Sequence, residues 1–371
     1  MSYMTIGIDA SRAFQKNKTG IEEYSYQVIK LLRDFFKGDQ VILYCNPAIN
    51  IKPDFSFPEN WQVKNLRAPI FWTQARLSLE MLFHPVDVLF VPAHTVPLIH
   101  PKNTIVTVHG LEFEFCPKAY SPWQRFYMRF VIKNSCRWAK KIIAVSENTK
   151  SDLISKYNVD EKKIKVIYEG YSEYNFQFPI SNFKSSPNNK ISNYRGYILF
   201  IGRLENRKNI NGIVEAFEIL KEKYKIAHKL ILVGKFGYGG DKIKEKIYKS
   251  EYKNDIILTG YVSEEDKYYL LKSAGMFLFP TFYEGFGLPI LEAQKVGTPV
   301  VTSNVSSMPE VAGDGAVLVD PKDPGAIAEA IYKLVSDESY KNDIIEKGLA
   351  NVKRFSWEKC SREIADVIRN L

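Results

Sequence analysis

The sequence has few cysteines and none of the spacings that make a metal or disulfide site. Only four occur in 371 residues, Cys45, Cys116, Cys136 and Cys360, and no two have the Cys-x-x-Cys spacing. Scattered thiols of this kind argue against a disulfide framework and a zinc site, and they fit a protein of the reducing cytosol.

Long apolar runs and leader segments are also missing. The long uncharged stretch Val88 to Pro101 is broken by Pro92 and Pro97 and is too short to span a bilayer. The first residues enter a predicted strand without the charged and then apolar leader of a secreted protein. Neither half opens with a Gly-x-Gly-x-x-Gly turn, which disfavours a dinucleotide oxidoreductase. We therefore expect a cytoplasmic protein that is not a dehydrogenase.

Positive charge is concentrated in the first half of the chain. Residues 1–185 hold 24 Lys and Arg against 17 Asp and Glu, which accounts for most of the net charge of +9. Basic residues there recur about every helical turn among large apolar ones: Arg125, Arg129, Lys133, Arg137, Lys140 and Lys141 among Trp123, Phe126, Tyr127, Met128, Phe130, Val131 and Ile132. This pattern predicts an amphipathic helix.

Two interpretations of this helix have equal support. It suits docking at an anionic membrane surface, and it also suits a solvated face whose arginine stems cover apolar side chains. Nucleic-acid binding is weaker, because no recognised motif accompanies the charge.

Short apolar runs alternate with helical segments along the whole chain, which predicts an α/β protein with two doubly wound parallel sheets. Strands are expected at 5–8, 41–45, 88–91, 104–108, 142–145 and 165–168, and then at 197–201, 230–233, 256–258, 276–279, 299–302 and 316–319. The polar segment Asn175 to Arg195 separates the two series. We predict domains at 1–180 and 195–355, followed by a terminal helix at 356–371.

Polar and glycine-rich signatures follow nearly every predicted strand. They lie at 9–12, 107–110, 146–148, 202–208, 234–235, 260–262, 284–285 and 303–310. Ligands bind beyond the carboxyl ends of the strands in such sheets. The pattern therefore predicts a ligand cleft between two facing domains.

The most informative of these signatures holds two glutamates. Glu284 and Glu292 flank a predicted strand-to-helix turn with Gly285, Gly287 and Pro289. A helix N-terminus favours an anion such as phosphate, while carboxylates there suit sugar hydroxyls. Either glutamate alone fits an ordinary role, a solvated loop acid or a first-turn helix residue. The combination favours a ligand site.

Several motifs together resemble the retaining GT-B glycosyltransferases of glycosyltransferase family 4. They are Gly202 to Asn209, Glu284 to Glu292, Gly297 to Val301 with Met308 to Glu310, and, in the N-terminal half, Ile142 to Thr149 and Val166 to Gly170. The resemblance implies two facing Rossmann-like domains, an acceptor-binding one at 1–180 and a donor-binding one at 195–355. It also implies that the helix at 356–371 crosses back onto the N-terminal domain, although a helix packed on its own domain would have the same sequence pattern.

The resemblance assigns roles in binding a nucleoside diphosphate sugar. Arg203 and Lys208 match the basic pair that clamps the diphosphate, where charge builds as the glycosidic bond breaks. Arg207, between them, is interpreted as an ordinary surface cation. Glu292 matches a ribose anchor, and Glu284 matches the residue that faces the donor sugar. Further donor-binding positions implied by the family are Gly20, Tyr261, Val262, Gly285, Phe286, Gly287 and Leu288.

His109 matches a histidine of the N-terminal domain that contacts the donor sugar. The family often places an acid after this histidine, but Gly110 stands here, so we expect Glu112 or Glu114 to supply the acid's hydrogen bond. The remaining histidines, His84, His94, His100 and His228, are expected to be structural. His109, Glu284, Arg203 and Lys208 are thus the candidate catalytic residues.

The chain contains no Asp-x-Asp, the carboxylate pair that holds a divalent ion in the other major glycosyltransferase architecture. We therefore expect a metal-independent enzyme without a cofactor, in which cations and a helix dipole act on the phosphates. The implied reaction moves a hexosyl group, with GDP-mannose preferred over a UDP-sugar, to a glycan or lipid-linked glycan of a surface polysaccharide. Peripheral contact with the inner face of the membrane would use Arg125, Arg129, Lys133 and Arg137. The alternatives are a GT-B nucleotide-sugar epimerase and a non-catalytic nucleotide-sugar-binding module.

Overall fold

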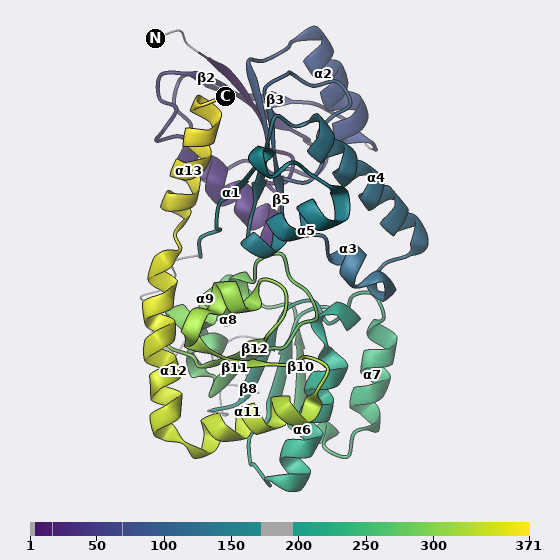
Figure 1. Cartoon of the computed structure of the whole chain (residues 1–371), viewed down its shortest axis with the longest axis vertical. Helices are drawn as coiled ribbons and strands as arrows, with labels where there is room; N and C mark the ends of the chain where they lie inside the picture. Colours follow the sequence, from purple (N-terminus) through teal and green to yellow (C-terminus); the bar gives the residue numbers. More distant parts are fainter. Residues whose placement is uncertain (1–3, 17, 69, 172–195) are drawn as a thin grey trace. The chain divides into compact units, whose positions relative to one another are not determined.

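The computed structural model describes residues 4–16, 18–68, 70–171 and 196–371, and the chain forms two compact units (Figure 1). The N-terminal unit comprises Met1–Leu111, Pro122–Gly170 and Phe355–Leu371, and the C-terminal unit comprises Glu112–Ser121 and Tyr171–Arg354. The boundary segment predicted at Asn175 to Arg195 lies outside the described residues.

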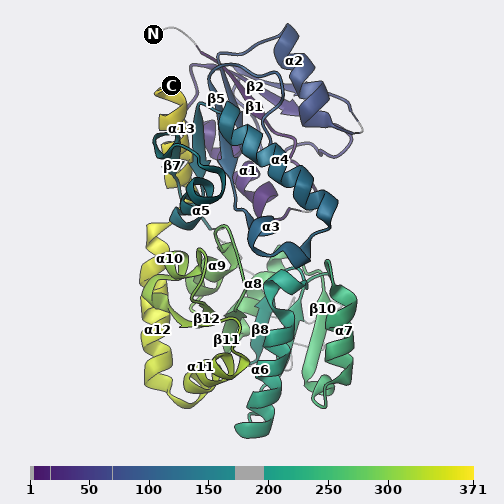
Figure 2. The ribbon, with the colours of Figure 1, turned by 45° about the vertical axis from the view of Figure 1, so that its right-hand side comes forward.

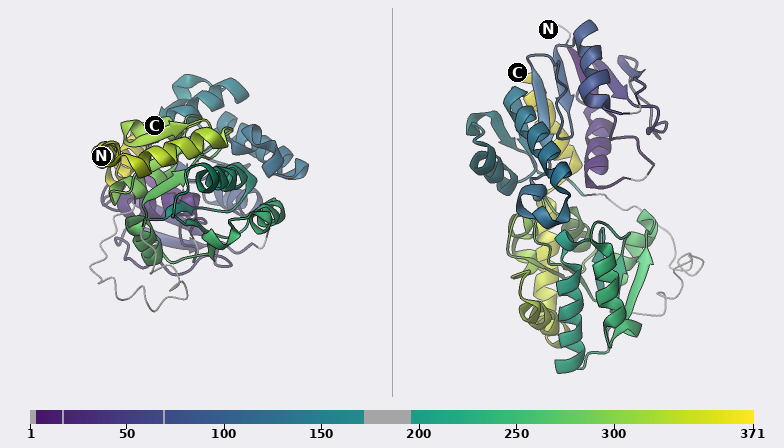
Figure 3. Two further views of the ribbon diagram at one scale, coloured as in Figure 1. Left: turned by 90° about the horizontal axis from the view of Figure 1, so that it is seen from below. Right: turned by 90° about the vertical axis from the view of Figure 1, so that its right-hand side faces the viewer.

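The N-terminal unit is built on a seven-stranded parallel sheet of order β3-β2-β1-β4-β5-β6-β7. Its strands are β1 (Thr5–Asp9), β2 (Gln40–Cys45), β3 (Trp61–Asn65), β4 (Val88–Val91), β5 (Thr104–Val108), β6 (Lys141–Ala144) and β7 (Ile164–Val166). β4 and β5 are buried along their whole length, as expected for central strands covered on both faces. Helices lie on both faces of this sheet (Figure 3).

The helices of the N-terminal unit lie between successive parallel strands, as in a doubly wound sheet, except α13, which is the last element of the chain (Figure 2). They are α1 (Gly20–Leu32), the π-helical turn η1 (Trp72–Leu77) with α2 (Ser78–Phe83), α4 (Pro122–Trp138), α5 (Glu147–Tyr157), the 3₁₀ turn η3 (Glu161–Lys163) and α13 (Trp357–Arg369). The predicted basic helix is α4. Lys140 and Lys141 lie beyond its end, and their ammonium groups donate to Leu371 O and Lys162 O, so their assignment to the helix was wrong.

The C-terminal unit has a six-stranded parallel sheet of order β10-β9-β8-β11-β12-β13. Its strands are β8 (Ile198–Ile201), β9 (Leu230–Val233), β10 (Ile256–Gly260), β11 (Met276–Phe279), β12 (Val300–Ser303) and β13 (Ala316–Val319). The helices and turns are α3 (Glu112–Phe115), η2 (Pro117–Ala119), η6 (Asn206–Lys208), α6 (Ile210–Lys223), α7 (Gly240–Lys249), η7 (Lys253–Asp255), α8 (Glu264–Ser273), α9 (Leu288–Lys295), α10 (Met308–Ala312), η8 (Gly313–Gly315), α11 (Pro324–Ser336), α12 (Glu338–Asn351) and η9 (Val352–Arg354).

The last helix, α13, belongs to the N-terminal unit, where it packs on α1 (Figure 1). Trp357, in the first turn of α13, is 4% exposed and its ring lies 6.0 Å from that of Tyr24 on α1. The backbone of Trp357 also presses on Gly170, where an added Cβ would lie 2.2 Å from its nitrogen. Glycine at 170 is therefore required for this close approach.

Parallel pairing brings the strand ends of each sheet to one edge. In the N-terminal unit Val108 of β5 is level with Ala144 of β6, and in the C-terminal unit Ile201 of β8 is level with Val233 of β9. The loops that carry the predicted polar signatures leave from these edges, so the sheets position them as the sequence indicated.

Candidate active site

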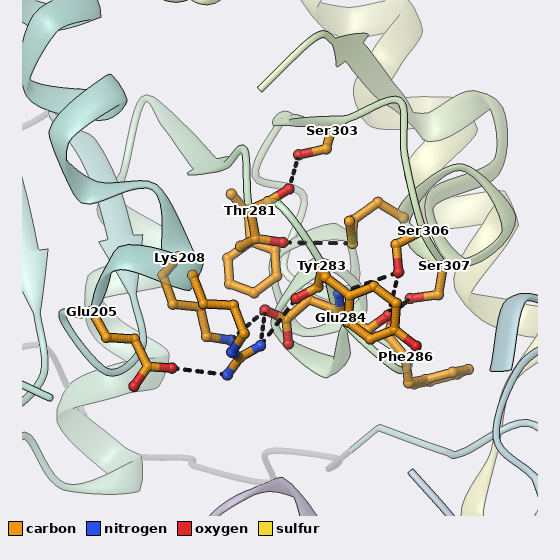
Figure 4. Close-up of polar contacts among 12 residues, drawn as sticks. Glu205, Lys208, Thr281, Tyr283, Glu284, Phe286, Ser303, Ser306 and Ser307 are labelled. Carbon is orange, nitrogen blue, oxygen red and sulfur yellow. Dashed lines mark hydrogen bonds and ion pairs between the residues drawn. The ribbon is translucent and has the colours of Figure 1, made fainter. Parts of the chain in front are cut away.

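Glu284 lies in the loop between β11 and α9, and its side chain is only 13% exposed. Its Oε1 accepts from Arg207 Nη1 at 2.8 Å and from Lys208 Nζ at 2.7 Å (Figure 4). Arg207 and Lys208 come from the short turn η6 that follows β8. The structure thus brings two of the predicted catalytic residues, Glu284 and Lys208, into direct contact.

The electrostatics of this cluster follow from burial and pairing. Burial alone would raise the pKa of Glu284, but Arg207 and then Lys208 outweigh it and hold the pKa below the ordinary value of 4.5. Burial lowers the pKa of Lys208 below 10.5, and the attraction of Glu284 only partly opposes this effect. At neutral pH the carboxylate is therefore firmly charged.

Arg207 is not an ordinary surface cation, and that interpretation was wrong. Its side chain is 14% exposed and donates to Glu284, to the carbonyl oxygen of Tyr283 at 3.0 Å and to Glu205 at 3.0 Å. Burial would lower the pKa of Arg207, but nearby acids, Glu284 foremost, raise it instead. The signal in the sequence was the position of Arg207 next to Lys208 and two residues after Glu205.

Arg203, the other predicted phosphate ligand, is exposed at the start of the same loop. Its side chain runs along the backbone at Gly237, where an added Cβ would lie 2.6 Å from Arg203 Cδ. The cation that is close to Glu284, in addition to Lys208, is thus Arg207 and not Arg203.

Two serines that the sequence did not single out hold the Glu284 loop in shape. Ser306 Oγ donates to the carbonyl oxygen of Glu284 at 2.6 Å, and Ser307 Oγ donates to the carbonyl oxygens of Glu284 and Phe286 at 2.9 and 2.6 Å (Figure 4). Both lie in the 303–310 segment. The sequence evidence for a role of this segment was that it is polar and follows a predicted strand. The backbone of Ser306, at φ 57°, is in the left-handed region. These bonds fix the backbone from which the Glu284 side chain extends.

The helix that follows is α9, with Gly287 as its N-cap at φ 119° and Pro289 in its first turn. Glycine tolerates this φ. Proline suits the first turn of a helix because an N–H group there would have no hydrogen-bond partner within the helix. Glu292, on the same helix, accepts from Lys267 Nζ of α8 at 2.9 Å, and its side chain is 11% exposed. Lys267 also pairs with Glu264 at 2.6 Å. The two glutamates of the motif therefore stand in different environments.

The remaining predicted donor-binding positions differ in exposure. Val262 and Phe286 are buried, at 8% and 4%, whereas Tyr261 is 57% exposed in the turn after β10. Gly20 begins α1 in the N-terminal unit, and nothing lies within 4 Å of an added Cβ there. Thr19 caps this helix, and its backbone N–H donates to the carboxylate of Glu22 at 3.1 Å.

The segment Glu112–Ser121 packs with the C-terminal unit near this cluster. The ring of Phe115 stacks on that of Tyr283, with centroids 4.8 Å apart and planes at 8°. After Glu284, the carboxylate of Glu112 contributes to the raised pKa of Arg207. Tyr283, the neighbour of Glu284, is thus held on its ring by Phe115 and on its carbonyl by Arg207.

His109 directly follows β5 in the N-terminal unit, and both of its ring nitrogens have partners there. Nδ1 lies 3.1 Å from Glu169 Oε1, and Nε2 lies 2.9 Å from the carbonyl oxygen of Pro92. The acid beside His109 is therefore Glu169, which the sequence analysis did not name, and the role expected of Glu112 or Glu114 stays a prediction. Glu169 follows β7 inside the Val166 to Gly170 motif, so the sequence signal was present but was not connected to the histidine.

A second imidazole packs against the first. His94 lies edge-on to His109, with ring centroids 5.4 Å apart. Its Nδ1 accepts from the backbone N–H of His109 at 3.4 Å. Burial, with smaller contributions from His109 and Arg12, lowers the pKa of His94 to about 3. His94 is therefore neutral at physiological pH.

Two parallel α/β units, with a glycine-basic loop after β8 and a carboxylate loop leading into α9, define a GT-B glycosyltransferase. Residues 18–173 match the family model described as Glycosyltransferase Family 4, and residues 181–350 match the one described as Glycosyl transferases group 1. The chain belongs to this family of glycosyltransferases.

Individual proteins are similar over most of the chain. The O-antigen chain mannosyltransferase B of Escherichia coli is 35% identical over 272 residues, which cover 73% of this chain and 71% of that protein. The O-antigen chain mannosyltransferase RfbU of Salmonella typhimurium is 26% identical over 337 residues, or 86% and 88% of the two chains. The crystal structure of Anabaena Alr3699/HepE in complex with UDP-glucose has a TM-score of 0.74 at 17% identity and covers 100% of both chains. These similarities confirm the predicted family and fold.

Within the part of the chain that the structure describes, no helix combines the length and the apolar character needed to cross a bilayer.

Proposed function

We propose that this glycosyltransferase moves a hexosyl group from a nucleoside diphosphate sugar to a glycan or lipid-linked glycan, with retention of anomeric configuration. The observation that carries the proposal is the buried Glu284 carboxylate, held charged by Arg207 and Lys208 beside the N-terminus of α9. A carboxylate among cations can bind sugar hydroxyls or stabilise positive charge at the anomeric carbon, while the cations can receive a diphosphate.

In this mechanism Lys208 and Arg203 bind the diphosphate and stabilise the charge that builds on it as the glycosidic bond breaks. The backbone N–H groups at the start of α9 add a partial positive charge. The acceptor hydroxyl attacks from the face that the diphosphate leaves, and the departing phosphate takes the acceptor proton. This route needs no nucleophile of the protein, and trapping a covalent glycosyl-enzyme would refute it.

GDP-mannose is the preferred donor in this proposal, and a UDP-sugar is the second choice. The mannosyltransferase relatives support mannose, whereas the similar HepE structure is a complex with UDP-glucose. A screen of sugar nucleotides by thermal unfolding separates the two, because a ligand of the folded state at 100 times its Kd adds about 2.7 kcal/mol of stability. A melting temperature raised by a UDP-sugar and not by GDP-mannose would reverse the choice.

The same relatives are O-antigen chain mannosyltransferases, which supports a role in surface polysaccharide assembly. We propose that this assembly takes place at the cytoplasmic face of the membrane. α4 supports peripheral contact there: Trp123, Phe126 and Phe130 are 72%, 62% and 58% exposed. On the same helix Arg129, Lys133 and Arg137 are exposed and Arg125 is partly exposed. Aromatic rings beside basic side chains suit the headgroup region of an anionic bilayer.

Vesicle co-sedimentation tests this contact. The variant with Arg129→Gln, Lys133→Gln and Arg137→Gln should lose binding to vesicles of phosphatidylglycerol and phosphatidylethanolamine, because each basic residue near an anionic surface contributes about 1 kcal/mol. The matched control neutralises Lys223, Lys246 and Lys249 on helices of the C-terminal unit. Equal binding of the α4 variant and the native protein would refute membrane contact through α4.

Two other functions share the fold. A nucleotide-sugar epimerase would convert the donor without any acceptor, and a binding module would bind the donor without turnover. Incubation of the protein with a labelled donor alone, and then with acceptor glycan, distinguishes all three. The cation–carboxylate cluster at Glu284 favours transfer.

A further inference from the structure

One carboxylate oxygen of Glu284 accepts hydrogen bonds from both cations of η6. Arg207 Nη1 and Lys208 Nζ each donate to Oε1, at 2.8 and 2.7 Å, and all three side chains are nearly buried, with 14%, 11% and 13% exposed. A buried carboxylate requires compensation by charge, and either cation could supply it. The two cations are nevertheless not equivalent, because their other contacts differ.

Lys208 has the contacts of a side chain that can move. Besides its bond to Glu284, the ammonium group lies over the face of the Phe279 ring, at 4.9 Å from the centroid. An ammonium on a flexible stem can turn from one anion to another at small cost. Under the proposed function, on which this inference rests, the donor's diphosphate attracts Lys208 and so competes with Glu284 for it.

Arg207 is fixed from three sides. Nη1 is shared between Glu284 and the carbonyl oxygen of Tyr283, and Nη2 donates to Glu205 Oε1 at 3.0 Å. Its acceptors belong to the loop that carries Glu284 and to the turn that carries Arg207 itself. A planar guanidinium with this set of bonds is pre-organised, and turning it toward a phosphate would break several of them.

The Arg207 Nε is buried without a hydrogen-bond partner among the described residues. An unpaired buried donor destabilises a protein, so packing alone would favour an apolar side chain at this position. An arginine retained here is better explained by its effect on Glu284.

We propose that Arg207 is a positioning residue that holds the Glu284 carboxylate charged and correctly oriented toward the donor sugar while Lys208 binds the diphosphate. Arg203 and Lys208 thus serve the leaving group, and Arg207 serves the carboxylate. Residues of one loop therefore act on both sides of the glycosidic bond, the diphosphate and the sugar.

Arg207→Gln and Arg207→Lys test the proposal, with Lys221→Gln as the matched control. Lys221 pairs with Asp255 at 2.7 Å and is 8% exposed in the same unit, so its loss also breaks a nearly buried ion pair. Arg207→Gln should lower kcat on the order of 10²–10³-fold with little change in the Kd of GDP. Its acidic limb of kcat should move upward by about one to three pH units, because the cation that lowers the pKa of Glu284 is gone. Arg207→Lys keeps the charge and should restore the acidic limb and part of kcat.

The control variant, Lys221→Gln, should lower the melting temperature and leave the pH profile of kcat unchanged. If Arg207→Gln also affects only stability, with a native kcat and acidic limb per folded molecule, Arg207 is merely structural and the proposal is wrong. If it weakens GDP binding as much as it lowers kcat, Arg207 is a phosphate ligand and the proposal is again wrong.

A readout that needs no turnover separates this inference from the proposed function. The ¹³C resonance of the Glu284 carboxyl, assigned through Glu284→Gln, can be titrated with and without GDP. In the GDP complex the native carboxyl should stay ionised at pH 5, whereas in Arg207→Gln it should take up a proton. Identical titrations in the two proteins would overturn the inference even if sugar transfer is observed. The expected difference, in a protein that transfers no sugar, would support the inference and reject the proposed function.

Discussion

At the scale of single residues, Glu284 and Glu292 show how one side-chain type takes different roles from its surroundings. Glu284 has two cations on one oxygen and lies in a loop fixed by Ser306 and Ser307. Glu292 stands on a regular helix and has Lys267 as its partner. A carboxylate held by two nearly buried cations suits the reacting part of a substrate, and one paired with a lysine on a regular helix suits a hydroxyl pair that is only bound.

Alanine at each position tests this difference. Glu284→Ala should lower kcat on the order of 10²–10³-fold and change donor affinity less, since it removes a group that acts in the transition state. Glu292→Ala should weaken the donor Kd by about tenfold or more, the value of one hydrogen bond to a charged group, and change kcat less. Titration calorimetry and initial rates measure both parameters. Two variants that altered only affinity would show that the role given to Glu284 is wrong.

The fall of kcat/KM for the donor at high pH should depend on the protonation of Lys208. Its pKa lies below 10.5, so Lys208 releases its proton at a lower pH than an exposed lysine does, and the phosphate-binding charge is lost as pH rises. We expect kcat/KM for the donor to fall on the alkaline side below pH 10.5. In Lys208→Arg the fall should move to higher pH, because arginine keeps its proton. An unchanged alkaline limb in that variant would exclude Lys208 as the group responsible.

The sequence was informative where a residue's role depends on its neighbours in the chain. Glu284, Gly287 and Lys208 stand in local motifs, and the structure finds them at strand ends as expected. Arg207 and Glu169 were missed because their partners are distant: Arg207 binds a loop more than seventy residues away, and Glu169 lies sixty residues from His109. Periodicity and motif spacing carry no signal for such contacts.

At the scale of elements, the central strands were predictable and one edge strand was not. β4, β9 and β11 are continuous apolar runs because helices cover both of their faces. β3 (Trp61–Asn65) lies at the edge of its sheet, and its central residues are exposed or partly exposed. Its polar sequence therefore looks like a loop, and only pairing with β2 makes it a strand.

α13 is the element whose placement has the clearest energetic test. Trp357→Ala removes a ring that is 4% exposed and should lower the free energy of unfolding by about 3–5 kcal/mol. Trp123→Ala is the matched control, since that ring is 72% exposed and its loss should cost less than about 0.5 kcal/mol. Urea unfolding followed by circular dichroism measures both. Similar midpoints for the two variants would contradict the packing of Trp357.

At the scale of the whole molecule, cations of the protein are proposed to do the work that a divalent ion does elsewhere. Lys208, Arg203 and the start of α9 supply positive charge for the diphosphate. Transfer should therefore proceed at its full rate after dialysis against EDTA. A large loss that Mg²⁺ or Mn²⁺ restores would show that the expectation of metal independence is wrong.

The division of the chain between the units is not sequential, and the alternation of strands and helices could not reveal this. Glu112–Ser121 leaves the first unit and packs with the second, and Phe355–Leu371 returns to the first. Neither unit is one continuous stretch of sequence. Expression of the first 170 residues alone would therefore leave out an element of the N-terminal unit.

That return of the C-terminus has a consequence for synthesis on the ribosome. The N-terminal sheet emerges early, but α1 receives its covering helix only after roughly 200 further residues, on the order of 10–40 s later at ordinary translation speeds. During that interval the side of α1 that faces α13 lacks the contacts that this helix makes, among them the ring of Trp357 against that of Tyr24. The part of the protein made first is thus completed last, and a stalled nascent chain would present this apolar surface to chaperones.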